Sequence, residues 1–174
     1  VLTDGEPGLS ELCRETTPSS KVPILDWFHI AMRLQHMKQC AAGLRCLVKT
    51  HRDAQIAIKE ELEKLHWRLW NGQTDSVGKI IVTLSSSIRR FRHYMKPHQK
   101  QRDSHRKLWV MLVELKRYIR NNETRVVNYN KRQLAGQPVS TALVESSVNS
   151  LINMRMNKKR QMRWSAPGAN KLLR

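Results

Sequence analysis

The sequence predicts a mainly α-helical protein with a small α/β part. Across residues 30–120, apolar residues recur in alternating steps of four and three, the period of amphipathic helices. Two short apolar runs near the start, in VLTDG and VPILDW, have instead the character of buried strands. The 174 residues suffice for one domain, or for one domain with an insertion, and can bury a sizeable core.

Residues 1–29 are predicted to form the end of an α/β unit. VLTDG predicts a short buried strand that runs into a turn, with Asp4 at its carboxyl end. Pro7 then opens a short helix, PGLSELCRE, since proline is well tolerated at the first position of a helix. VPILDWFHI predicts a second strand that passes straight into a helix.

Residues 30–120 are predicted to form an α-helical insertion of four helices. Polar segments, KTHRD, NGQTD and KPHQKQRDS, separate four apolar stripes. Each stripe lies on one helix face, so we expect the helices to bury the stripes against one another as a bundle. The stripes are Ile30, Leu34, Met37, Ala41, Leu44 and Val48; Ile58, Leu62, Leu65 and Leu69; Val77, Ile81, Leu84, Ile88, Phe91 and Met95; and Leu108, Leu112, Leu115 and Ile119.

Residues 121–174 are predicted to return to the α/β core. An irregular polar segment comes first, and a helix follows from about Ser140, a suitable N-cap. Glu145 lies at the edge of the apolar stripe of this helix, which contains Val144, Val148 and Leu151. The helix leads into a basic cluster that ends at Trp164.

The charge is concentrated in the second half of the chain. The formal net charge is +18; residues 1–88 have 11 basic and 10 acidic groups, and residues 89–174 have 21 and 4. Such segregation indicates a polyanionic partner, most often nucleic acid. We expect no membrane association, because no run approaches the ~18 apolar residues of a span. Three cysteines without zinc spacing favour a reduced, cytoplasmic protein.

A carboxylate at a strand end, Asp4, and another on a later helix, Glu145, form a pattern found in two-metal nucleases. Phosphodiester cleavage needs cations that activate water and stabilise the leaving oxygen, and carboxylates are hard ligands for Mg²⁺ or Mn²⁺. Spacing alone is weak evidence, because an Asp-Gly pair is more often only a turn. Glu145 has a simple alternative role as a surface partner of basic residues.

Three segments together resemble DDE transposases of bacterial insertion sequences, in particular the ISKra group. They are LTDGEPGL, ILDWFHIAMRL and, after the long helical insert, PVSTALVESSVNSLINMRMNKKRQMRW. The resemblance implies a ribonuclease H-like catalytic fold interrupted by the four-helix insertion. It also implies Mg²⁺- or Mn²⁺-dependent DNA cleavage and strand transfer at the ends of a mobile element. The expected location is the bacterial cytoplasm, in association with the nucleoid.

The resemblance assigns roles to individual residues. Asp4 matches the second catalytic carboxylate and Glu145 the third, so both are expected to bind metal, with their carboxylates about 4–8 Å apart. Asp26 and His29 match the accessory Asp-x-x-His element. Two alternatives stay open: Asp26 replaces Asp4 as the catalytic residue, or Asp26 and His29 are a buried hydrogen-bonded pair that fixes the strand-to-helix junction.

No residue matches the first carboxylate of the triad, so this chain is expected to be a C-terminal portion that is inactive by itself. Contact with DNA is expected from a basic and aromatic cluster, Lys158, Lys159, Arg160, Arg163 and Trp164. For Trp164 the alternative is a buried side chain that anchors the last helix. The alternatives are a non-catalytic basic helical nucleic-acid-binding protein, such as a decayed transposase, and a helical assembly module that pairs subunits as a homo-oligomer.

Aromatic and histidine side chains of the bundle carry less weight. Trp67, Trp70 and Trp109 lie on or beside the apolar stripes and are expected in the core. Most of the remaining histidines are expected on solvated faces and loops, namely His36, His51, His66, His93, His98 and His105.

Overall fold

The computed structural model describes residues 1–5, 8, 23–46, 48–93, 104–156 and 165. The chain divides into two compact units, Val1–Val139 and Ser140–Arg174, and each is described here by itself. Most of the predicted helix PGLSELCRE and the basic cluster at 158–164 lie outside the described residues.

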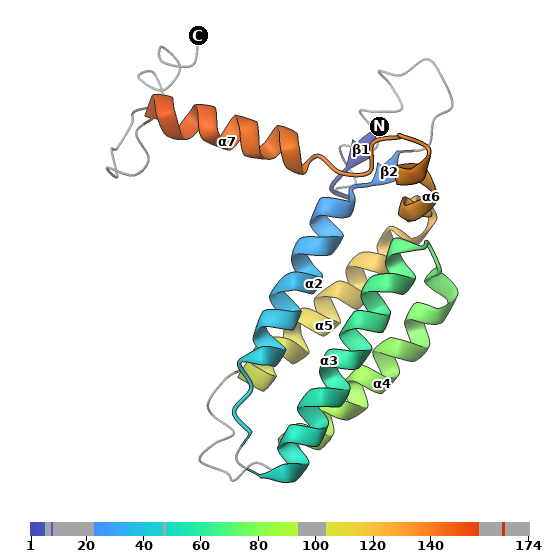
Figure 1. Cartoon of the computed structure of the whole chain (residues 1–174), viewed down its shortest axis with the longest axis vertical. Coiled ribbons are helices and arrows are strands. Elements are labelled where there is room, and N and C mark those ends of the chain that lie inside the picture. The colour runs from blue at the N-terminus through green and yellow to red at the C-terminus, as the bar shows by residue number, and fades with distance from the viewer. Residues whose placement is uncertain (6–7, 9–22, 47, 94–103, 157–164, 166–174) are drawn as a thin grey trace. The chain divides into compact units, whose positions relative to one another are not determined.

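The first unit contains a four-helix bundle, as predicted. Its helices are α2 (Trp27–Ala42), α3 (Lys49–Trp70), α4 (Thr74–His93) and α5 (Ser104–Asn121). Helix α2 packs on α3 and α5, and α4 packs on the same two neighbours, so the four helices form a closed ring around one core (Figure 1).

The predicted apolar stripes form the core of this bundle. Eighteen stripe residues are buried: Ile30, Leu34, Met37, Ala41, Leu44, Ile58, Leu62, Leu65, Leu69, Val77, Ile81, Leu84, Ile88, Phe91, Leu108, Leu112, Leu115 and Ile119. Val48 is an exception, because α2 ends at Ala42 before Gly43, a poor helix former. Val48 is the exposed N-cap of α3 instead of a core residue.

Three side chains lie elsewhere than predicted, for one geometric reason. His51 and His105 are buried, because each extends an apolar row of its helix by one turn, ahead of Ala54 and Leu108 respectively. The His51 ring lies against Phe91, with ring centroids 4.9 Å apart. Trp67 is 59% exposed, because it lies off the buried row of α3.

Both predicted strands are present and pair with each other. Strand β1 (Leu2–Thr3) runs parallel to β2 (Ile24–Leu25), with Leu2 opposite Ile24 and Thr3 opposite Leu25. Helix α2 begins two residues after β2, so the strand passes almost directly into the bundle (Figure 1).

The segment after α5 is more ordered than its polar composition predicts. A 3₁₀ turn, η2 (Glu123–Arg125), leads to a short helix, α6 (Tyr129–Leu134). Asn128 caps α6, since its side-chain oxygen accepts a hydrogen bond from the Lys131 amide at 2.9 Å. Tyr129 is fully buried, and its hydroxyl donates to the Leu25 carbonyl at 2.8 Å. The expectation of an irregular segment was therefore wrong at its centre.

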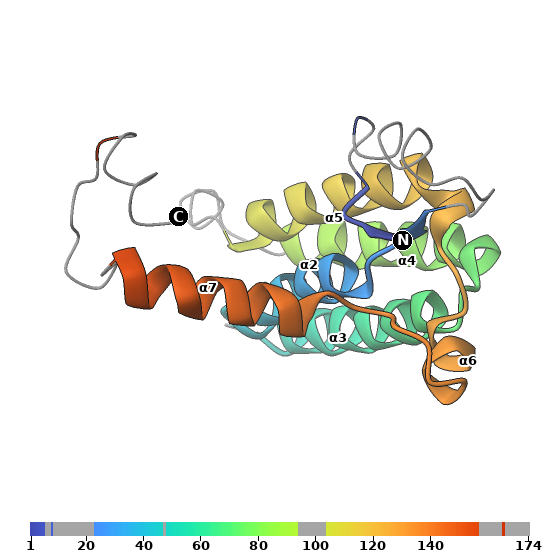
Figure 2. The same ribbon diagram turned by 90° about the horizontal axis from the view of Figure 1, so that it is seen from above.

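The second unit contains α7 (Ala142–Met156), which begins close to the predicted position. The Ser140 hydroxyl accepts a hydrogen bond from the Ala142 amide at 3.1 Å, although Thr141, whose carbonyl accepts from the Glu145 amide, is the residue directly before the helix. Val144 and Val148, two members of the predicted stripe, are exposed. Figure 2 shows the helices of the chain from above. Among the described helices of both units, none has the length and apolar character needed to cross a membrane.

Candidate active site

The pairing of β1 and β2 brings two aspartates to one edge of the sheet. Asp4 directly follows β1, and Asp26 directly follows β2. The Asp26 amide donates to the Thr3 carbonyl at 2.8 Å, so the pairing continues to the last residue before each aspartate. Because paired strands lie about 4.8 Å apart, the backbones of Asp4 and Asp26 are neighbours at the carboxyl end of the sheet. This edge is where parallel α/β sheets bind ligands.

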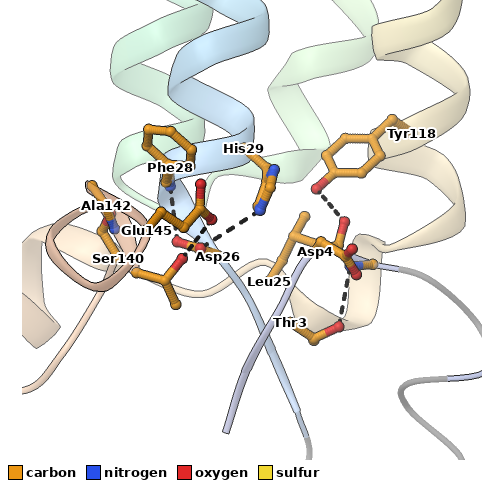
Figure 3. A network of polar contacts seen from close by, with 12 residues as sticks. Thr3, Asp4, Leu25, Asp26, Phe28, His29, Tyr118, Ser140, Ala142 and Glu145 are labelled. Carbon is orange, nitrogen blue, oxygen red and sulfur yellow. Dashed lines mark hydrogen bonds and ion pairs between the residues drawn. The ribbon is translucent and has the colours of Figure 1, made fainter. Parts of the chain in front are cut away.

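The turn that follows Asp4 is held by two contacts. The Gly5 amide donates to the Thr3 hydroxyl at 3.1 Å, and the Tyr118 hydroxyl donates to the Asp4 carbonyl at 2.8 Å (Figure 3). Gly5 has a φ of +92°, and a Cβ atom at this residue would lie 2.8 Å from the side chain of the buried Asn122. The Asp-Gly pair is therefore a tight turn, and α5 fixes it in place.

Asp26 is almost fully buried and has a structural role at the start of α2. Its Oδ1 accepts a hydrogen bond from the Phe28 amide at 2.9 Å, so Asp26 is the N-cap of the helix (Figure 3). Its Oδ2 lies 3.8 Å from Nε2 of His29, which is one helical turn further along α2. This geometry agrees with the interpretation of Asp26 and His29 as a strand-to-helix junction.

The same two atoms also fit a shared metal ion. Metal–oxygen and metal–nitrogen bonds of about 2.1 Å allow ligand atoms up to about 4.2 Å apart, and 3.8 Å is within this limit. A direct N–H···O hydrogen bond, by contrast, is typically about 2.9 Å. Carboxylates suit Mg²⁺ and Mn²⁺, whereas an imidazole ligand favours Mn²⁺ over Mg²⁺.

Tyr118 lies beside the two aspartates and Arg33 lies against Tyr118, although sequence reasoning assigned neither to the site. Burial raises the pKa of Tyr118 to about 12, with further raising contributions from Asp4 and Asp26 and an opposing one from Arg33. The Arg33 guanidinium carbon is 4.4 Å from the centre of the Tyr118 ring. Asp26, His29 and Arg33 are spaced by three and four residues, which is the local signal for one helix face.

Glu145 lies in the second unit, in the first turn of α7. Its carboxylate accepts a hydrogen bond from the Thr141 hydroxyl at 3.0 Å. An acidic residue there is also favoured by the positive end of the helix dipole. Asp4 belongs to the first unit, so the expected 4–8 Å between Asp4 and Glu145 stays a prediction.

The second expected site also stays untested. Lys158, Lys159, Arg160, Arg163 and Trp164 lie outside the described residues. Comparison of the chain with protein-family models, with curated proteins and with solved structures finds no significant match.

Proposed function

We propose that this chain is the C-terminal portion of a DDE transposase that cuts and joins DNA with the help of Mg²⁺ or Mn²⁺. One observation carries the proposal: two carboxylates, Asp4 and Asp26, end paired parallel strands directly before a four-helix bundle. A ribonuclease H-like core split by a helical insertion requires this order of elements. The sequence resemblance supplies the activity and the substrate, DNA at the ends of a mobile element.

In this proposal the metal ligands come from both units. Asp26, His29 and Glu145 each offer one ligand atom of a kind that binds metal ions. Asp4 is not among these three, and only its backbone is placed beside that of Asp26 by the strand pairing. A bound cation would supply Lewis-acid activation of the attacking hydroxyl group. Tyr118 and the Gly5 turn hold the backbone of Asp4, and the N-cap contact holds the Asp26 side chain.

The covalent chain favours a contribution from Glu145. The Trp27 amide donates to the Val139 carbonyl at 3.1 Å, so the first unit ends beside the residue that follows Asp26. Only five residues separate Val139 from Glu145, and the last three of these are helical. At about 3.5 Å per extended residue and 1.5 Å per helical residue, the Cα atoms of Val139 and Glu145 are at most about 15 Å apart.

Metal binding by this chain is the first test. We expect Mn²⁺ to bind in a calorimetric titration and Glu145→Gln to weaken binding at least tenfold. Asp26→Asn separates the two roles of Asp26, because asparagine is an equally good N-cap but lacks the negative charge. We expect this variant to keep the thermal midpoint of the wild type and to bind Mn²⁺ more weakly. Unchanged Mn²⁺ affinity would leave Asp26 as a helix cap alone.

Cleavage is the second test, and it uses a longer protein that includes the upstream strands with a first carboxylate. We expect Mg²⁺-dependent nicking of a labelled element end, which Asp4→Asn or Glu145→Gln abolishes while DNA affinity is retained. Glu114→Gln, on α5, is the matched control, because it removes one exposed carboxylate that is not a proposed metal ligand. Full cleavage by Glu145→Gln would exclude Glu145 as a metal ligand.

A further inference from the structure

Helices α4 and α5 each have a second row of side chains beside the buried one. The buried rows are Val77, Ile81, Leu84, Ile88 and Phe91 on α4, and His105, Leu108, Leu112, Leu115 and Ile119 on α5. One position further along the chain, with the same helical spacing, lie the flanking rows. They are Gly78, Val82, Ser85, Arg89 and Arg92 on α4, and Arg106, Trp109, Val113, Lys116 and Arg120 on α5.

The two flanking rows adjoin each other across the α4–α5 pair. The Arg89 guanidinium carbon lies 5.3 Å from the centre of the Trp109 ring, and the helices pack side by side (Figure 1). This contact joins the C-terminal part of α4 to the N-terminal part of α5, so the helices are antiparallel. Together the rows form one surface, which we name the α4–α5 face.

The α4–α5 face is cationic. Its ten residues include five basic side chains, all exposed, and neither described row contains Asp or Glu. The excess is specific to this side of the bundle: α4 and α5 together contain nine Lys or Arg and two carboxylates, whereas α3 contains five Lys or Arg and four carboxylates. A surface with one sign of charge and no internal ion pairs attracts a polyanion.

We propose that the α4–α5 face binds the phosphate backbone of duplex DNA. From Arg106 to Arg120 is 14 residues along α5, about 21 Å at 1.5 Å per residue, and this length spans about six base pairs. Arginine, the more frequent basic residue here, binds phosphate through two parallel N–H···O bonds. Trp109 holds the Arg89 guanidinium over its ring, which reduces the entropy that Arg89 loses on binding.

The choice of DNA as the polyanion rests on the proposed function, but the contact itself needs no metal ion. Phosphate contacts specify no sequence, so we expect this face to bind any duplex. The face therefore provides affinity, while the carboxylates provide chemistry.

The test measures duplex binding by the full chain in EDTA. Fluorescence anisotropy of a labelled 20-base-pair duplex reports the affinity at KCl concentrations between 50 and 200 mM. In the face variant, Arg89, Arg106, Lys116 and Arg120 are replaced by Ala. The slope of log K against log[salt] is negative, and each lost phosphate contact reduces its magnitude by about 0.9. We therefore expect a slope up to about 3.6 smaller in magnitude, and at least tenfold weaker binding at low salt.

The matched control removes four basic residues from α3, namely Arg52, Lys59, Lys64 and Arg68, which are all exposed. Both variants lose the same net charge, so net charge alone predicts equal effects. We expect the control to keep a slope near that of the wild type. If the face variant has a lower thermal midpoint, the pair Lys116→Gln and Arg120→Gln, which leaves the Arg89–Trp109 contact intact, gives the same comparison.

Two outcomes would overturn the inference: equal weakening by the face and control variants, and no weakening by the face variant. If the face variant binds duplex normally but loses binding to polyglutamate, the partner of the face is an acidic protein. A face variant that binds duplex like the wild type, in a protein whose cleavage requires Asp4 and Glu145, would leave the proposed function standing.

Discussion

Replacing Tyr129 with Phe should destabilise the first unit through the loss of one hydrogen bond. The Tyr129 hydroxyl donates to the Leu25 carbonyl at 2.8 Å, and both residues have zero exposure to solvent. The ring also packs against Trp27 and Trp70, with centroid distances of 5.0 and 6.0 Å, and phenylalanine keeps these contacts. The substitution therefore leaves a buried carbonyl without its donor and changes little else.

The expected magnitude follows from that geometry. A buried carbonyl that loses its partner costs about 1–3 kcal/mol. The first unit has 139 residues, and at about 2.1 cal/mol/K per residue its unfolding entropy near 60 °C is about 0.29 kcal/mol/K. A loss of 1–3 kcal/mol should lower the thermal midpoint by about 3–10 °C.

Thermal and urea unfolding, followed by circular dichroism, measure the effect. The urea midpoint should fall while the m-value stays constant, because the surface exposed on unfolding is unchanged. Tyr118→Phe is the matched control, since its hydroxyl also donates to a backbone carbonyl at 2.8 Å, but both Tyr118 and Asp4 are partly exposed. Water can replace that donor, so we expect a loss below about 1 kcal/mol. If Tyr129→Phe lowers the free energy of unfolding no more than Tyr118→Phe does, burial does not explain the contribution of this hydrogen bond to stability.

Three further substitutions have definite expected outcomes. Gly5→Ala should lower the free energy of unfolding by about 1–2 kcal/mol or more, because of the positive φ and the contact with Asn122, and urea unfolding measures it. Gly78→Ala should raise the same free energy by about 0.5–1 kcal/mol, since a Cβ there meets nothing within 4 Å and alanine is the better helix former. Burial lowers the pKa of His66, so the unfolded chain takes up a proton near pH 6.5 before the folded protein does. Stability should therefore fall as pH drops below about 6.5, and His66→Gln should flatten a plot of urea midpoint against pH.

The bundle was predictable because its signal repeats along each helix. The apolar pattern recurs over several helical turns, as in the row Leu62, Leu65 and Leu69. One residue that departs from the pattern therefore does not change the prediction. The strand ends were also predictable, because an apolar run before Asp4 and another before Asp26 indicate the edge of a sheet. Local patterns therefore predicted both strand ends, whereas the family resemblance, not a local pattern, singled out Asp26 and His29.

The supporting residues were not predictable, because their contacts link distant parts of the chain. Tyr118 reaches Asp4 across 114 positions, and Tyr129 reaches Leu25 across 104. No periodic pattern encodes such a contact, and the polar surroundings of Tyr129 suggested an irregular segment. The usable signals were weaker ones: Asn128 as an N-cap before Tyr129, and the spacing that places Arg33 on the helix face of Asp26.

Helix α5 connects the two features to which we assign function. Tyr118 holds the Asp4 turn, while Lys116 and Arg120, which belong to the α4–α5 face, lie within two residues of it. At 100° per residue, these two side chains point about 160–200° away from Tyr118. Because a helix with its side chains is about 10–12 Å thick, a duplex on the α4–α5 face would lie at least one helix diameter from Asp4. Under the proposed function, the face would hold DNA that flanks the cleavage site, and the scissile phosphate would come from another segment of the duplex.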